Sequence, residues 1–410
     1  MVNLKLKTEK MKIFFGGKMS DEESNPVQIQ HHSFHSAFEF NPDKKGVLNG
    51  DLYYHELVDR KIPENEHFTY PVILPSGNRK YSKGILLLHG LNEKSWEKYL
   101  AWSSELAERL QCPVILFPIA YHMNRAPRSW SDPRQMKEVV QSRLKTSNKS
   151  EATFANAALS TRLAAHPEQF IYSGIQSYYD VCALTDEINK GNHPLFEANS
   201  FIDFFAYSIG AFLAQILLIA NPNRRFDHSR LFLFAGGPTF DRMMGTSRYI
   251  MDFQAFKSLL TLKRRKILKK IYAELSTAQL PEFEPMWHGF YAMLHHRKGR
   301  KFRKEWLMNK SESIQVVALK NDRVMPARAI AHTFKTPRNV EPVRIDVIDF
   351  PFAYTHENPF PLNDDKIQPL VNRSFEVMID KAVRFYQQTV SGKVALQFVS
   401  GFSKVRLAHT

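Results

Sequence analysis

Cysteine is scarce in this sequence, and long apolar runs are absent. Two cysteines, Cys112 and Cys182, occur in 410 residues, each inside an apolar or helix-like segment. This argues against a disulfide framework or a cysteine metal site and predicts two buried thiols. No run of 18 apolar residues occurs, so no membrane-spanning helix is expected. The apolar cluster Ile13–Phe15 is too short for the core of a signal peptide. We therefore expect a cytoplasmic protein, for which Met11 and Met19 are alternative starts.

Acidic residues are fewer than basic residues in this sequence. The 56 Lys and Arg against 41 Asp and Glu give a formal net charge of +15. Such an excess attracts anions, whether substrates, membrane surfaces or nucleic acid. The composition implies none of these specifically. We expect a small-molecule partner, an anionic ester or acyl compound included, leave peripheral membrane contact open, and do not expect nucleic acid.

Histidines gather near the start of the chain, at His31, His32 and His35. No cysteine or carboxylate cluster adjoins them, so surface histidines are favoured over a metal site. We expect neither a metal nor a cofactor.

The stretch around Ser208 is the most informative one. A strand-length aromatic and β-branched run begins at Phe201 and precedes the serine, and an apolar run of helical length follows it. Ser208 therefore falls at a strand-to-helix turn. Ala206 and Gly210 flank it where a sharp turn brings the backbone too close for larger side chains. The first amides of the next helix would then face the hydroxyl and stabilise negative charge there. A structural serine is the alternative.

This stretch resembles the nucleophile elbow Gly-x-Ser-x-Gly of the α/β-hydrolase superfamily, with Ala206 in place of the first glycine. Upstream, the four apolar residues Ile85–Leu88 fit a strand that is buried on both faces of a parallel sheet. His89-Gly90 ends this strand. That order resembles the oxyanion loop of the superfamily, although an ordinary strand-end turn is the alternative. The resemblance implies that the backbone amides of Leu91 and Ile209 form the oxyanion hole. It also makes three residues of these two stretches candidate substrate contacts: His89, Gly90 and Tyr207.

Two further side chains follow predicted strands. Asp322 comes just after Ile314–Leu319, and His356 lies in the loop after Val343–Ile348. The order Ser, Asp, His is the one that the superfamily uses, and strand ends would bring all three to one edge of the sheet. Asp241 is the alternative acid. His356 is preferred because it lies in the loop after the last strand, unlike the other candidates: His288, His295, His296 and His332.

Two insertions interrupt the expected sheet. Residues 120–167 leave the end of a strand, where the loops of α/β folds form pockets, and here Arg125 and Arg128 could grip a carboxylate or phosphate. Residues 238–313 look helical and carry 16 Lys and Arg against 7 Asp and Glu. A segment at this position is where the superfamily commonly carries its cap. The clusters Lys263–Lys266 and Arg297–Lys304 are either a solvated helix face or a surface for anions.

The sequence thus predicts an α/β protein of the α/β-hydrolase fold, with a mostly parallel sheet, helices on both faces and a helical cap. Residues 1–237 and 314–390 would form the core, 238–313 the basic cap and 391–410 a tail. The predicted function is a serine esterase, with Ser208 as nucleophile, His356 as base and Asp322 as the orienting acid. An acyltransferase with the same triad, or a non-catalytic binding protein that retains the fold, is the alternative.

Overall fold

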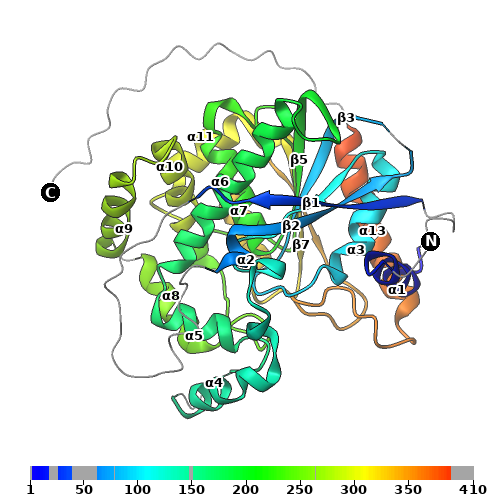
Figure 1. Ribbon diagram of the computed structural model, residues 1–410. Coiled ribbons are helices and arrows are strands. Elements are labelled where there is room, and N and C mark those ends of the chain that lie inside the picture. Colours follow the sequence, from blue (N-terminus) through cyan, green and yellow to red (C-terminus); the bar gives the residue numbers. More distant parts are fainter. Residues whose placement is uncertain are drawn as a thin grey trace.

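An eight-stranded sheet runs through the middle of the protein (Figure 1). The computed structural model describes residues 2–17, 26–38, 62–77, 79–146, 151–263 and 265–388. The strand order is β1-β2-β4-β3-β5-β6-β7-β8. Strand β2 runs antiparallel to both of its neighbours, and all other pairs are parallel. The strands are β1 (Val27–His35), β2 (His67–Pro75), β3 (Tyr81–Leu88), β4 (Val114–Leu116), β5 (Phe196–Tyr207), β6 (Leu231–Phe234), β7 (Ile314–Leu319) and β8 (Arg344–Ile348).

Successive residues of the central strands pack into two different cores. In β5, Phe204 and Ala206 face one core, while Phe205 and Tyr207 face the other. This follows from the period of two along a strand, and it explains why residues 204–207 of β5 are apolar on both faces.

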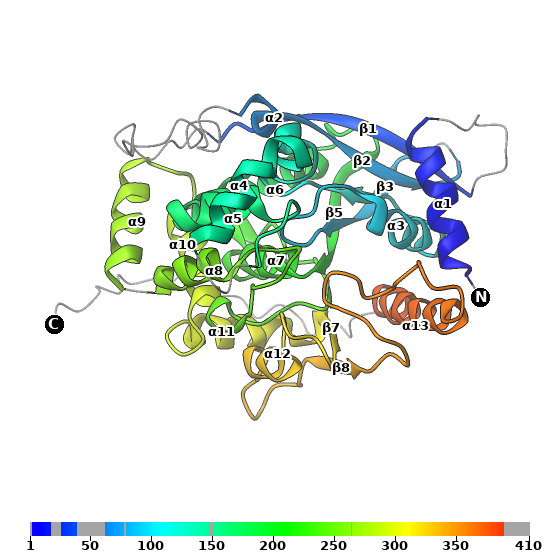
Figure 2. The ribbon, with the colours of Figure 1, turned by 90° about the horizontal axis from the view of Figure 1, so that it is seen from below.

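Helices cover both faces of the sheet (Figure 2). Helices α1, α3 and α13 lie on one side, and α6 and α7 on the other, with α10 packed against α7. The longer helices are α1 (Leu4–Phe15), α3 (Glu97–Leu110), α4 (Pro133–Thr146), α5 (Ala157–Ala165), α6 (Gln169–Asn189), α7 (Ile209–Ala220), α9 (Arg265–Thr277), α10 (Phe283–Leu294), α11 (Arg300–Lys310) and α13 (Gln368–Gln387). The short ones are α2 (Pro63–Glu66), α8 (Phe253–Leu259), α12 (Ala327–Thr333) and the 3₁₀ turns η2 (Met123–Arg125), η3 (Arg128–Ser131), η4 (Pro222–Arg224), η5 (Phe240–Arg242), η6 (Leu260–Lys263) and η7 (Ser311–Ser313).

The strand order and the two helical layers are those of an α/β-hydrolase, so the predicted fold class is confirmed. None of the described helices is both long and apolar enough to cross a membrane. Both cysteines are buried and unpaired, and burial raises the pKa of each thiol to about 12. The predicted tail at 391–410 lies outside the described residues, as do the side chains of 263–265 in the first basic cluster.

Two segments lie beside the end of the sheet where β5 meets α7. We call residues 121–146 and 151–165, with α4 and α5, the first arm, and residues 240–262, with η5, α8 and η6, the second arm. Helices α5 and α8 pack against each other. A buried ion pair also joins the arms, because Arg143 donates to both carboxylate oxygens of Asp252 at 2.5 and 2.7 Å.

The predicted cap at 238–313 thus divides in the structure. Its first part is the second arm, whereas α10 and α11 pack against α7 beside the sheet. The apolar face of α10 packs against α7, whose residues are almost all apolar and buried. The two helices come close at Gly289, which lies against the backbone of Ile216.

Candidate active site

Ser208 occupies a sharp turn between β5 and α7. Its backbone angles, φ 55° and ψ −120°, lie in a region that side-chain-bearing residues rarely adopt. The turn is held by a close approach at Gly210, where an added Cβ would lie 2.4 Å from the carbonyl oxygen of Leu88. Glycine is therefore required two residues after the serine.

A chain of hydrogen bonds links Ser208, His356 and Asp322. The Ser208 Oγ lies 2.6 Å from His356 Nε2, and His356 Nδ1 lies 2.7 Å from Asp322 Oδ2. All three side chains are buried, with exposed fractions of 2–5%. Because His356 Nδ1–H donates a hydrogen bond to Asp322, the lone pair of Nε2 points at the serine hydroxyl.

The second oxygen of Asp322 is also fixed. Its Oδ1 accepts hydrogen bonds from the amides of Val324 and Met325, both at 2.8 Å. The alternative acid Asp241 instead accepts from Thr239 and from the His296 amide. His356 therefore contacts Asp322, and Asp241 lies in another network. The alternative histidines lie on or just after α10 and on α12, away from this chain: His288, His295, His296 and His332.

Tyr207 supports the histidine. Its ring stacks on the ring of His356 with centroids 5.5 Å apart and planes 13° apart. Its hydroxyl donates to the backbone carbonyl of His356, and its exposed fraction is 1%. Tyr207 was predicted as a substrate contact; in the structure its hydroxyl is used to position His356.

Two residues that line a cavity with the serine have backbone amides without an acceptor among the described residues. Within the described part of the chain, neither Leu91 N–H nor Ile209 N–H donates to another group, whereas Gly210 N–H donates to the carbonyl of His89. Leu91 and Ile209 line one cavity together with Ser208. Unpaired donors beside a nucleophile suit a developing oxyanion.

His89 and Gly90 hold the oxyanion loop from behind. His89 Nδ1 donates to the Gly90 carbonyl at 2.8 Å, and its Nε2 accepts from the Ile119 amide at 2.9 Å. Burial lowers the pKa of His89 to about 3, so the ring is neutral. The Gly90 amide donates to the Tyr99 hydroxyl. Both residues were predicted as substrate contacts; in the structure their hydrogen bonds go to groups within the protein.

The cavity above Ser208 is small and apolar. Its volume is about 30 Å³. The second arm supplies much of the wall, and the rest comes from the oxyanion loop, α6 and the segment after Asp322. The apolar lining residues are Leu91, Phe170, Phe240, Met243, Ile250, Met251, Phe256, Leu259, Val324 and Met325.

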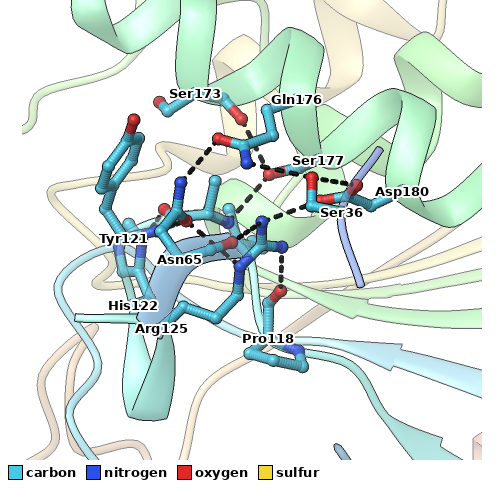
Figure 3. A network of polar contacts seen from close by, with 12 residues as sticks. Ser36, Asn65, Pro118, Tyr121, His122, Arg125, Ser173, Gln176, Ser177 and Asp180 are labelled. Atoms are coloured by element: carbon cyan, nitrogen blue, oxygen red, sulfur yellow. Dashed lines mark hydrogen bonds and ion pairs between the residues drawn. The ribbon is translucent and has the colours of Figure 1, made fainter. Parts of the chain in front are cut away.

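Arg125 does not reach this cavity. It is fully buried, and its guanidinium donates to Asp180 Oδ2 at 2.8 Å, to the Pro118 carbonyl and to both oxygens of Asn65 (Figure 3). Arg125 was predicted to grip a substrate anion; in the structure its guanidinium already has acceptors inside the protein. Arg128 is exposed on η3 and does not line this cavity.

A comparison with known protein families identifies the family of this sequence. Residues 4–387 match a family described as "Family of unknown function (DUF6051)". The chain belongs to this family. No curated protein matches its sequence.

Solved structures resemble it at low identity. Esterase LipW from Mycobacterium marinum is 11% identical with a TM-score of 0.44, over 94% of this chain and 90% of that one. Carboxyl esterase 2 from the mycorrhizal fungus Tuber melanosporum is 10% identical with a TM-score of 0.43, over 90% and 88%. The peroxisomal α/β-hydrolase Lpx1 from Saccharomyces cerevisiae is 13% identical with a TM-score of 0.40, over 91% and 94%.

Proposed function

We propose that this protein is a serine hydrolase that cleaves a carboxylic ester through an acyl-enzyme. The observation that carries the proposal is the hydrogen-bonded chain from Ser208 through His356 to Asp322 at the β5–α7 turn. A serine hydroxyl is too weakly acidic to attack an ester unaided, and this chain supplies the base that it needs.

In the first half of the reaction, Ser208 Oγ bonds to the ester carbon while its proton passes to His356 Nε2. The carbonyl oxygen becomes an oxyanion beside the amides of Leu91 and Ile209. The C–O bond to the alcohol then breaks, and His356 gives its proton to the leaving oxygen. In the second half, water replaces the alcohol, His356 takes the proton from water, and the acid leaves as Ser208 regains its hydrogen.

Asp322 serves this cycle by holding one tautomer of His356. The ring becomes positively charged when it takes the serine proton, and the buried carboxylate 2.7 Å away stabilises that charge. Tyr207 also holds the ring in place. It stacks on the ring and donates a hydrogen bond to the backbone carbonyl of His356.

The cavity supports an ester with a short apolar chain. Its walls carry no charged side chain, and a volume of about 30 Å³ corresponds to roughly two water-sized probes. An acyl or alcohol group of a few carbon atoms fits this space.

A fluorophosphonate probe tests the proposal without knowledge of the natural substrate. We expect one adduct per chain, located at Ser208 by peptide mass mapping, and none in Ser208→Ala. Absence of label from a folded parent protein would favour a binding protein that retains the fold. Where Ser208 is labelled, transfer of the acyl group to added alcohol in preference to water would identify an acyltransferase.

A further inference from the structure

A second cavity lies next to the one above Ser208. Its volume is about 40 Å³, against roughly 10–15 Å³ for one water molecule, so it holds a group of a few heavy atoms. Leu91, Phe170 and Ile209 line both cavities. The two spaces are therefore neighbours at Leu91 and Ile209, the residues proposed for the oxyanion hole, and the second one extends from there between α6, α7 and α10.

One polar atom in this apolar space has no partner. His122 lines the cavity, its exposed fraction is 7%, and its Nε2 is buried without a hydrogen bond in the structure. The opposite nitrogen, Nδ1, lies 2.8 Å from the carbonyl of Ala120 and must donate to it. Burial, together with the neighbouring His89, Lys94 and Arg162, holds the pKa of His122 well below its usual range. The ring is neutral, and Nε2 can only accept a hydrogen bond.

The backbone around His122 is strained. Both Tyr121 and Met123 have positive φ, at 64° and 51°. The network of Figure 3 fixes them there: the Ala120 amide donates to Ser177, the Tyr121 amide donates to Asn65, and Arg125 anchors the next turn. Strain of this kind persists only where the surroundings impose it, and it is concentrated at functional sites.

A buried acceptor without a donor is unfavourable, because it has lost its hydrogen bond to water. A ligand that brings a donor would recover this energy. The other polar side chain in the lining, Ser173, directs its hydroxyl hydrogen to the Phe170 carbonyl at 3.2 Å, which leaves oxygen lone pairs. Acceptors alone do not suit a carboxylate, and the positive charges of Lys94 and Arg162 near His122 disfavour an ammonium group. A neutral hydroxyl fits both conditions.

The position of the cavity indicates which part of the ester enters it. The leaving alcohol must receive a proton from His356, so it lies on the His356 side of Ser208. The second cavity lies beyond Leu91 and Ile209 and does not include Ser208. We propose that this cavity binds the acyl chain and that His122 Nε2 accepts a hydrogen bond from a hydroxyl group on it, so that the substrates are esters of short hydroxy acids. This rests on the proposed esterase function.

The test compares p-nitrophenyl butyrate with the p-nitrophenyl esters of 2- and 3-hydroxybutyrate, each enantiomer separately. In the parent protein we expect at least one hydroxy ester to exceed butyrate in kcat/KM by tenfold or more. In His122→Phe this preference should fall by about 10- to 100-fold, the range that a buried hydrogen bond confers. His122→Gln, which keeps an acceptor, should restore part of it.

His193→Phe is the matched control, because His193 is another buried histidine, bonded to Tyr70 away from the site. It should keep the preference. Equal rates for hydroxylated and plain esters in the parent, or the same preference in His122→Phe as in the parent, would overturn the assignment. Labelling of Ser208 by the phosphonate is measured on the same samples, so failure of the esterase proposal is distinguished from failure of the hydroxyl site. The parent ratio decides the matter even if His122→Phe does not fold.

Discussion

At the scale of single residues, the two oxygens of Asp322 have separate tasks. Oδ1 accepts from two backbone amides, and Oδ2 accepts from His356. An asparagine would keep the first task with its carbonyl oxygen but would present an NH₂ group to Nδ1. His356 would then carry its proton on Nε2, where it cannot accept one from Ser208.

Asp322→Asn should therefore lower kcat for p-nitrophenyl butyrate by about four orders of magnitude with little loss of stability. Asp241→Asn is the control, because Asp241 contacts Thr239 and His296 instead, and it should stay within a few-fold of the parent. Stopped assays of both variants at saturating substrate decide the point. A loss below tenfold in Asp322→Asn would remove Asp322 from the mechanism.

The sequence could indicate Ser208, Asp322 and His356 because each follows a strand, and strand ends of a parallel sheet meet at one edge. The sequence could not show how deeply each side chain is buried. Arg125 has the side chain of an anion-binding residue, yet it is fully buried against Asp180. Tyr207 follows the strand pattern as well as any site residue, and only its stacking on His356 shows that it acts through that ring.

At the scale of elements, the β5–α7 turn depends on how closely α7 approaches β3. An alanine at position 210 would place Cβ 2.4 Å from the Leu88 carbonyl oxygen and 2.8 Å from that of His89. Both atoms belong to the backbone, so they cannot move aside without displacing the oxyanion loop.

We expect Gly210→Ala to lower the free energy of unfolding by about 1–3 kcal/mol and to slow phosphonate labelling of Ser208 at least tenfold. Gly16→Ala, at the end of α1, is the control because its nearest atom would be 3.4 Å away. Urea denaturation and labelling rates measure the two effects. Unchanged stability and labelling in Gly210→Ala would show that the turn tolerates a side chain.

Element boundaries were predictable where apolar residues were continuous. The bounds of β7 agree with the sequence, but β5 begins at Phe196, five residues before the predicted start. Its early part is polar, and the register with β3 shifts between Tyr81 and Lys83, so no simple alternation marks it. Helix α1 was missed because it buries few residues, Leu4, Thr8 and Met11 among them, and is attached to α3 through Lys7 and Glu105.

At the scale of the whole molecule, buried neutral histidines make stability depend on pH. Burial lowers the pKa of His89 to about 3 and that of His193 to about 4, below the ordinary value of 6.5, and that of His122 well below it. Between about pH 6.5 and pH 4 the unfolded chain therefore binds protons that the folded chain does not. These groups make stability fall as the pH falls through this window.

The free energy of unfolding, measured in urea from pH 7 to pH 4.5, should decrease accordingly. In His193→Phe the slope should be smaller by about one bound proton, because one of the three groups is gone. The loss of the Tyr70 partner lowers the whole curve without changing its slope. An identical slope in parent and variant would show that His193 titrates alike in both states.

The ion pair between Arg143 and Asp252 has a consequence for the timing of turnover. Its side chains are 7% and 1% exposed, so separating the arms would break an ion pair in a poorly hydrated place, which is costly. If the site opens, we therefore expect the two arms to move together rather than as independent flaps. Such motions take microseconds to milliseconds. For an ester that fits the site well, entry of the substrate and release of the products would then limit the rate, and cleavage of the ester bond would be faster.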